Sequence, residues 1–253
     1  MNRNLKTDTI ILRSRRIGEL HKGLSCLTRT SGVLDVVAYG AGKGKSKLAG
    51  LVDPFSLLYL YLYYDPVKDN YKVTDIEQRT IFPAIRLSMG KFYTASFWAE
   101  LILKTFSGGG ESRLVYSLLS ESLGILNNSN ERDHILILIQ FIWRYLVISG
   151  FQPDIEHCGY CGNLLSLSEL LWYGELENQI LCSSCGTDAD LISLSPGGLK
   201  YLQHTATMDL LPGMKIGLDM RSAESLRRIL LTMIQGIVEY PLNTLKKGLL
   251  YNL

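Results

Sequence analysis

The amino-acid sequence predicts a multi-domain α+β fold: a five-stranded antiparallel barrel, then an α-helical domain that holds an inserted four-cysteine zinc module. Three observations support this prediction. Short apolar segments separated by turns fill residues 1–81, which is the pattern of an all-β domain. From Pro83 onward, apolar residues recur at helical spacing. Two Cys-x-x-Cys pairs lie within the helical part, and paired motifs of this kind are typical of metal sites.

Five strands are expected in the N-terminal part of the chain. The first carries Ile10, Ile11 and Leu12, and a two-residue turn at Ser31-Gly32 joins the second to the third. The predicted strands cover residues 7–16, 23–30, 33–39, 51–64 and 71–81. β-Branched and aromatic residues, which favour strands, are frequent in them. Because no crossover helices separate these strands, a small antiparallel barrel of the oligonucleotide-binding (OB) kind is expected.

Helices dominate the rest of the chain. They are predicted over residues 92–106, 111–126, 132–149 and 222–240. A further helix opens at Ser195-Pro196, because serine caps helices and proline suits the first helical position. Gly150 fits a helix end. The expected domains are an OB-fold DNA-binding domain at 1–81 and a helical domain at 82–253 that contains the zinc module at 157–186.

The composition is that of a globular protein, with 47% hydrophobic and 20% charged residues. Gln140 and Arg144 interrupt the longest apolar stretch, residues 135–148. That stretch is shorter than the roughly 20 apolar residues that a membrane span needs. The N-terminus shows no apolar segment typical of a secretory leader. We therefore expect a cytoplasmic protein.

The strongest functional signal is the set Cys158, Cys161, Cys182 and Cys185. Each pair presents two thiolates to one ion, and the spacer is long enough for a hairpin to return the second pair. Sulfur-only tetrahedral sites select zinc or iron–sulfur chemistry. One structural Zn²⁺ is the expected cofactor, and a thioredoxin-like redox pair is the competing interpretation. Cys26, alone on a predicted strand, is interpreted as a small buried apolar residue.

Charge is unevenly distributed along the chain, although the net charge is only +2. Residues 1–50 hold ten Lys and Arg against three Asp and Glu, a balance of +7, whereas residues 51–253 have a balance of −5. A basic N-terminal part predicts an anionic partner, with nucleic acid as the first candidate. A solvated basic face is the alternative. The candidate nucleic-acid-binding residues are Arg13, Arg15, Arg16, Lys22, Arg29, Lys43, Lys45 and Lys47.

A glycine- and lysine-rich loop spans residues 40–47. Its Gly44-Lys45-Ser46 is similar to the end of a phosphate-binding P-loop, but Tyr39 stands where that motif needs glycine, and a strand follows instead of a helix. ATP binding is therefore not expected. The loop is expected either to lie along a sugar–phosphate backbone or to be a plain surface loop.

Alternation in the segment Tyr59-Leu-Tyr-Leu-Tyr63 places its tyrosines on one face of a strand. That face either presents stacking platforms for bases or belongs to the core.

No catalytic constellation is visible in the sequence. The four histidines are scattered, and the carboxylates form no cluster of the kind that binds catalytic metals. A protein without enzymatic activity, and hence without catalytic residues, is expected. Two alternatives stay open: a zinc-containing nucleic-acid-processing enzyme, and a protein-interaction scaffold whose barrel binds protein rather than DNA.

The order of these parts resembles the bacterial RecO family of DNA repair and recombination mediators over nearly the whole chain. The resemblance is carried by residues 9–19 (TIILRSRRIGE), 27–34 (LTRTSGVL), 38–48 (AYGAGKGKSKL), 51–55 (LVDPF) and 141–161. In the last segment, a helix ending at Gly150 runs into the first cysteine pair.

The resemblance implies a non-enzymatic mediator of homologous recombination in the RecF pathway. RecO proteins bind single- and double-stranded DNA through the barrel, anneal complementary strands and, with RecR, help to load RecA onto DNA coated by single-stranded DNA-binding protein. The implied partners are DNA, RecR, the C-terminal tail of single-stranded DNA-binding protein and, indirectly, RecF and RecA, in the bacterial cytoplasm at the nucleoid. By the match, the DNA contacts fall on Arg13, Arg15, Arg16, Lys43, Lys45 and Lys47.

Overall fold

A computed structural model describes residues 3–43, 46, 48–106, 108, 111–187, 191–238 and 240–246. The chain forms two compact units. The first runs to Asn128 and includes the C-terminal segment from Leu242, and the second is Ser129–Pro241. The predicted boundary between residues 81 and 82 falls between the last barrel strand and the first helix. The division of the chain into domains at that point remains a prediction.

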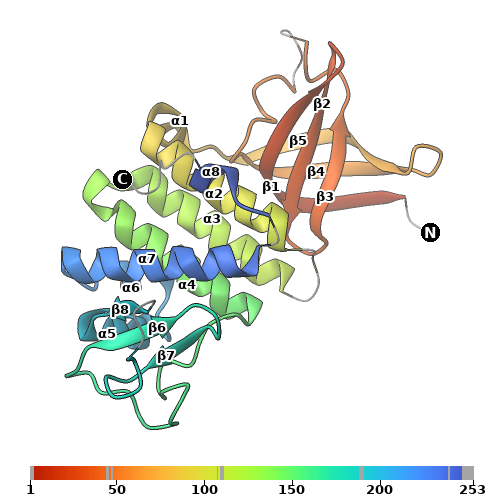
Figure 1. The fold of residues 1–253 in the computed structure, drawn as a ribbon. Coiled ribbons are helices and arrows are strands. Elements are labelled where there is room, and N and C mark those ends of the chain that lie inside the picture. The colour runs from red at the N-terminus through yellow and green to blue at the C-terminus, as the bar shows by residue number, and fades with distance from the viewer. Residues whose placement is uncertain are drawn as a thin grey trace. The chain divides into compact units, whose positions relative to one another are not determined.

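The first unit opens with a closed five-stranded barrel (Figure 1). Its strands are β1 (Asn4–Ile17), β2 (His21–Thr28), β3 (Gly32–Ala38), β4 (Leu57–Asp65) and β5 (Asn70–Thr80). The order around the barrel is β1-β2-β3-β5-β4, and every neighbouring pair is antiparallel except β3 and β5, which pair in parallel. The predicted OB-type barrel is thereby confirmed. The fourth strand begins at Leu57 instead of 51, because the chain turns through Phe55, whose φ of 66° is incompatible with a strand.

The barrel interior is filled by one face of each strand. On β4, Leu58 and Leu60 are fully buried and Leu62 is 2% exposed, and all three belong to the barrel core. Since successive side chains of a strand point to opposite faces, the tyrosines between them lie on the outside of the barrel. Cys26 is also in this core and is inaccessible to solvent, as predicted, and burial raises the pKa of its thiol.

Four helices complete the first unit: α1 (Pro83–Leu87), α2 (Met89–Thr105), α3 (Ser112–Asn128) and α8 (Asn243–Lys246). Helix α2 packs on the outside of β1 and α3 on β2. Ile10 and Leu12 are therefore buried although only Ile11 belongs to the barrel core. The predicted turn at Gly32 also packs closely against the α2–α3 connection, because a Cβ on Gly32 would lie 2.6 Å from the Cα of Gly108.

The second unit contains the 3₁₀ turn η1 (Glu131–Asp133) and the helices α4 (His134–Ser149), α5 (Pro196–Thr205), α6 (Leu210–Met214) and α7 (Met220–Ile237). A three-stranded sheet of order β7-β6-β8 is formed by β6 (Leu171–Gly174), β7 (Gln179–Leu181) and β8 (Ile192–Leu194). The Ser195 hydroxyl accepts the N–H of Gly198 at 3.0 Å and Gly150 ends α4 with a φ of 73°, both as predicted. Helix α7 starts two residues earlier than expected, because Asp219 is its cap.

Gln140 and Arg144, the two residues that interrupt the apolar stretch of α4, form a polar network with the end of α5. The Gln140 amide donates to the Thr205 hydroxyl at 2.9 Å. The Arg144 guanidinium donates to the carbonyls of Thr205 and Met208 at 3.3 and 2.6 Å. These bonds tie α4 to the chain that follows α5, and the Thr205 carbonyl also accepts the N–H of Met208 at 3.2 Å. Within the described ranges, no helix is long and apolar enough to cross a membrane.

We expect Arg144→Met to lower the free energy of unfolding by about 2 kcal/mol, because it removes the guanidinium donor from the Met208 carbonyl and from the side-chain oxygen of Gln140. Urea denaturation followed by circular dichroism measures this. The control is Arg132→Met, the same change at an exposed position of η1. Equal stability of the two variants would show that the network contributes nothing.

Candidate metal centre and nucleic-acid interface

The two cysteine pairs meet in one cluster in the second unit. The Sγ atoms of Cys158, Cys161, Cys182 and Cys185 all lie within 4.8 Å of one another, and those of Cys161 and Cys182 are 3.9 Å apart. Four sulfurs placed around a zinc ion at about 2.3 Å would be separated by about 3.8 Å. The hairpin of β6 and β7, which separates the two pairs in sequence, brings them together as predicted.

Backbone amides prepare this cluster for negative charge. The Cys182 N–H donates to the Cys158 sulfur at 3.4 Å. Burial opposes ionisation of Cys158, but amide donors from Cys161, Cys182 and Tyr160 outweigh it and lower the pKa of the thiol to about 6. The pKa of the Cys185 thiol is raised to about 12. The main cause is a hydrogen bond with the Cys182 side chain, and the second is burial. Thiols this close do not all ionise by themselves, whereas a bound cation deprotonates them.

The glycines after the two pairs have different roles. Gly162 has a φ of 73°, and its N–H donates to the carbonyl of Cys158 at 2.9 Å, so it reverses the chain after the first pair. Gly186 provides space, because a Cβ there would lie 2.0 Å from the Trp172 ring. Both residues support the geometry of the sulfur cluster.

The part of the chain around the cluster is acidic. Between Arg144 and Lys200 the sequence contains seven Asp and Glu and neither Lys nor Arg. Four thiolates around a divalent ion would add two further negative charges. This charge disfavours contact between the cysteine module and the phosphates of DNA. This excess of carboxylates can be read from the sequence alone.

Three of the predicted cations lie at one end of the barrel, where the β1–β2 turn meets the loop after β3. The N–H of Gly42 donates to the carbonyl of Leu20 at 3.0 Å, which ties the loop to the turn. The side chains of Arg15, Arg16 and Lys43 are exposed, and none of them forms an ion pair within the described part of the chain. We call these three residues the basic end.

The other predicted cations are placed differently. Lys22 lies on the same face as Ala38 at the mouth of the barrel, and its ammonium is 3.0 Å from the Asp53 carboxylate, so its charge is compensated. Arg29 lies at the opposite end of β2 and is 3.7 Å from Asp8. Lys45 and Lys47 lie outside the described residues.

Arg13 and Arg15 share the outer face of β1, as alternation predicts. They pair with Ser25 and Gly23, whose neighbours Leu24 and Cys26 point into the core. Arg13 therefore lies beside the basic end but faces helix α2, where it lines a cavity.

Sequence reasoning missed Lys68 and Lys72, which lie 5.6 and 5.8 Å from the centre of the Tyr39 ring. Tyr39 in turn packs edge-on against His21, beside the basic end. Lys72 is paired with Asp65, whereas Lys68 is an exposed cation on the β4–β5 turn. Only the parallel pairing of β3 with β5 brings this hairpin beside the loop, and no local pattern indicates it.

The outward tyrosines of β4 contact cations as well. The ammonium of Lys6 is 4.9 Å from the centre of the Tyr61 ring, and the guanidinium of Arg79 is 5.0 Å from that of Tyr59. Arg79 also pairs with Asp8 and with Glu77. This face is therefore close to electrically neutral, in contrast to the basic end.

The fold and these sites define an OB-barrel protein with a cysteine centre suited to a metal ion. Comparison with protein families is consistent with this class. The N-terminal model of recombination protein O matches residues 1–82, and its C-terminal model matches residues 86–246. The chain belongs to the recombination protein O family, a family of DNA repair and recombination, as the sequence motifs indicate.

Curated relatives are distant but cover most of both chains. A protein of Desulforamulus reducens named DNA repair protein RecO is 26% identical over 236 residues, which are 93% of this chain and 88% of the relative. Proteins of the same name from Alkaliphilus metalliredigens and Rubrobacter xylanophilus are 26% and 28% identical. These alignments cover 89% and 79% of this chain, and 90% and 80% of the relatives.

We expect a chelator to lower the melting temperature of the metal-loaded protein, because a metal ion that joins four cysteines from two separate segments adds its binding free energy to that of folding. Differential scanning fluorimetry measures the shift, and elemental analysis measures the metal content. Cys161→Ser should lower both, whereas Cys26→Ala, in the barrel core, should leave the metal content unchanged. An unaltered melting temperature after complete metal removal would contradict a structural role.

Proposed function

We propose that this protein mediates DNA repair and homologous recombination by binding single- and double-stranded DNA at the basic end and annealing complementary strands. One observation carries the proposal. Arg15, Arg16 and Lys43 gather on one end of an OB barrel, exposed and without an ion pair in the described ranges. Unpaired, mobile cations are the groups that replace the counterions of a phosphate backbone.

Annealing follows from the kind of contact that these cations make. Phosphate contacts hold a strand without occupying the edges of its bases. If cations neutralise two backbones at once, the repulsion between strands falls while the bases stay free to pair. Binding is therefore insensitive to sequence and weakens steeply as salt is added.

The partners of the protein are proposed from its family. With RecR, it helps to load RecA onto DNA coated by single-stranded DNA-binding protein, and it acts indirectly with RecF. The helical part holds the acidic C-terminal tail of the single-stranded DNA-binding protein. Arg228 of α7 is exposed and suits such a tail, whereas Arg227 is engaged by Glu224 at 2.7 Å.

The cysteine cluster is proposed to hold one structural Zn²⁺. Four thiols fill the coordination sphere of zinc and leave no position for a substrate or an activated water. The protein therefore acts by binding rather than by catalysis, in the cytoplasm of a bacterium.

Replacing Arg15, Arg16 and Lys43 with alanine is expected to weaken DNA binding. It should also reduce the slope of log affinity against log salt by roughly two to three, because about three phosphate contacts are lost. Fluorescence anisotropy over a salt series measures both quantities, with labelled single strands and with duplexes.

The matched control replaces three exposed cations of the second unit, Arg132, Lys200 and Lys215, with alanine, which changes the net charge equally. Its affinity and salt slope should match those of the unaltered protein. A fluorescence annealing assay tests the activity itself. The proposal fails if the protein does not accelerate the pairing of complementary strands above the spontaneous rate in low salt.

A further inference from the structure

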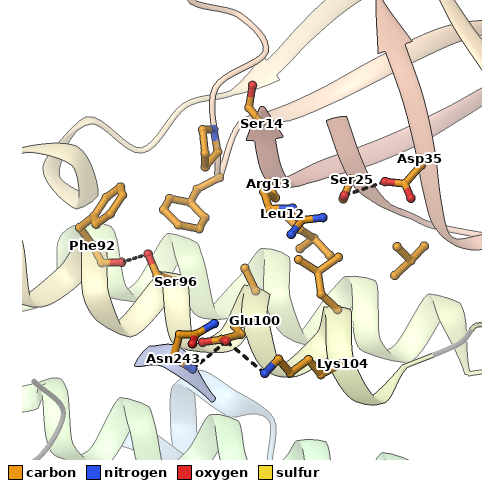
Figure 2. Close-up of a pocket in the computed structure, with 15 residues that line it drawn as sticks. Leu12, Arg13, Ser14, Ser25, Asp35, Phe92, Ser96, Glu100, Lys104 and Asn243 are labelled. Carbon is orange, nitrogen blue, oxygen red and sulfur yellow. Dashed lines mark hydrogen bonds and ion pairs between the residues drawn. The ribbon is translucent and has the colours of Figure 1, made fainter. Parts of the chain in front are cut away.

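A cavity of about 580 Å³ lies within the first unit, between the outer face of the barrel and helix α2 (Figure 2). Its barrel wall includes Leu12 and Arg13 of β1, and its other wall is formed by Phe92 and Leu103 of α2. The volume is in the range of sites that hold small organic groups. Membership of the family does not depend on this cavity. Strand β1 carries both part of the cavity wall and part of the basic end.

Aromatic rings form one side of the cavity. Phe92 is 41% exposed, which is unusual for a phenylalanine beside a well-packed interface. Its ring meets that of Phe55 edge-on, with centroids 5.6 Å apart, and Phe55 itself is 4% exposed. The Phe92 ring is therefore held by a buried neighbour while part of its surface faces the cavity.

The cavity contains one cation that is free to bind a ligand. Arg13 is exposed and forms no ion pair with any described residue. The two carboxylates of the lining have hydrogen-bond donors from the protein, and Asp35 is exposed. Asp35 accepts the Ser25 hydroxyl at 2.7 Å, and Glu100 accepts the backbone N–H of Asn243 at 2.8 Å (Figure 2). Lys104 is 3.5 Å from Glu100, so the guanidinium of Arg13 is the group left to meet an anion.

We propose that this cavity is a subsite for an unpaired base of single-stranded DNA. The base stacks on the Phe92 ring, and the adjacent phosphate meets Arg13. This inference rests on the proposed function, because it extends the DNA path from the basic end. Arg13 and Arg15 lie two residues apart on the same face of β1, so a strand held by Arg15 passes the mouth of the cavity.

The subsite discriminates between single strands and duplexes. A base in a duplex is stacked and paired, and its removal costs a few kcal/mol. An unpaired base offers its face to an aromatic ring at no such cost, and stacking of this kind tolerates any sequence. The basic end therefore serves both forms of DNA, whereas the Phe92 subsite serves only single strands.

Phe92→Ala is expected to weaken the binding of oligothymidine by about tenfold, which is the typical loss when one stacked base is removed. Duplex affinity should stay unchanged. The salt slope of single-strand binding should also stay unchanged, because phenylalanine neutralises no phosphate. Fluorescence anisotropy with the full-length, metal-loaded protein measures all three.

Two further variants test whether the aromatic face of Phe92 causes the change in single-strand affinity. Phe92→Trp should retain single-strand affinity, whereas Phe92→Leu, which keeps an apolar side chain without a π-face, should lose most of it. Phe151→Ala is the matched control, because Phe151 is a phenylalanine of similar exposure, 46%, in the second unit. It should bind like the unaltered protein.

The outcomes separate this inference from the proposed function. Normal single-strand binding by Phe92→Ala, or equal losses for single strands and duplexes, would overturn the subsite while leaving the basic end intact. Absence of DNA binding by the unaltered protein would instead remove the proposed function. Arg13→Ala tests the proposed phosphate contact, since it should lower the single-strand salt slope by about 0.7.

Discussion

Closure of the barrel around its apolar interior is the constraint on which its exposed surfaces depend. The side chains of Leu58, Leu60 and Leu62 occupy that interior. Because a strand alternates, their burial forces the intervening tyrosines outward. Closure also requires β3 to pair with β5, and that pairing sets the β4–β5 hairpin beside the lysine-rich loop. The apolar core therefore determines where the exposed cations lie, although it contains no charged residue itself.

Positive and negative charges are concentrated in different parts of the chain. The N-terminal 50 residues are strongly basic, whereas the segment around the cysteine cluster contains neither Lys nor Arg between Arg144 and Lys200. An anionic partner is attracted to the first and repelled by the second. A metal ion held by the cysteine cluster would stabilise its own segment, since small modules with little core rely on a metal for stability.

The proposed DNA site within the first unit combines two kinds of contact that differ in what they recognise. Cations such as Arg15 and Lys43 respond to phosphate charge, which every nucleic acid carries. An aromatic face such as that of Phe92 responds to a free base, which only a single strand presents. The proposed annealing activity would use both, because it requires holding a single strand before pairing and a duplex afterwards.

The sequence by itself determined the five barrel strands, the long helices, the cysteine cluster and the basic N-terminal part. These depend on periodicity, spacing and composition, which are local properties of the chain. It did not determine whether the tyrosine face of β4 is exposed or buried, that the charge of Lys22 is compensated by Asp53, or that Lys68 lies beside Tyr39. Only the tertiary structure decided these points, because closure of the barrel brings together side chains that are far apart in sequence. For the same reason, the cavity between Arg13 and Phe92 exists only once β1 and α2 have packed.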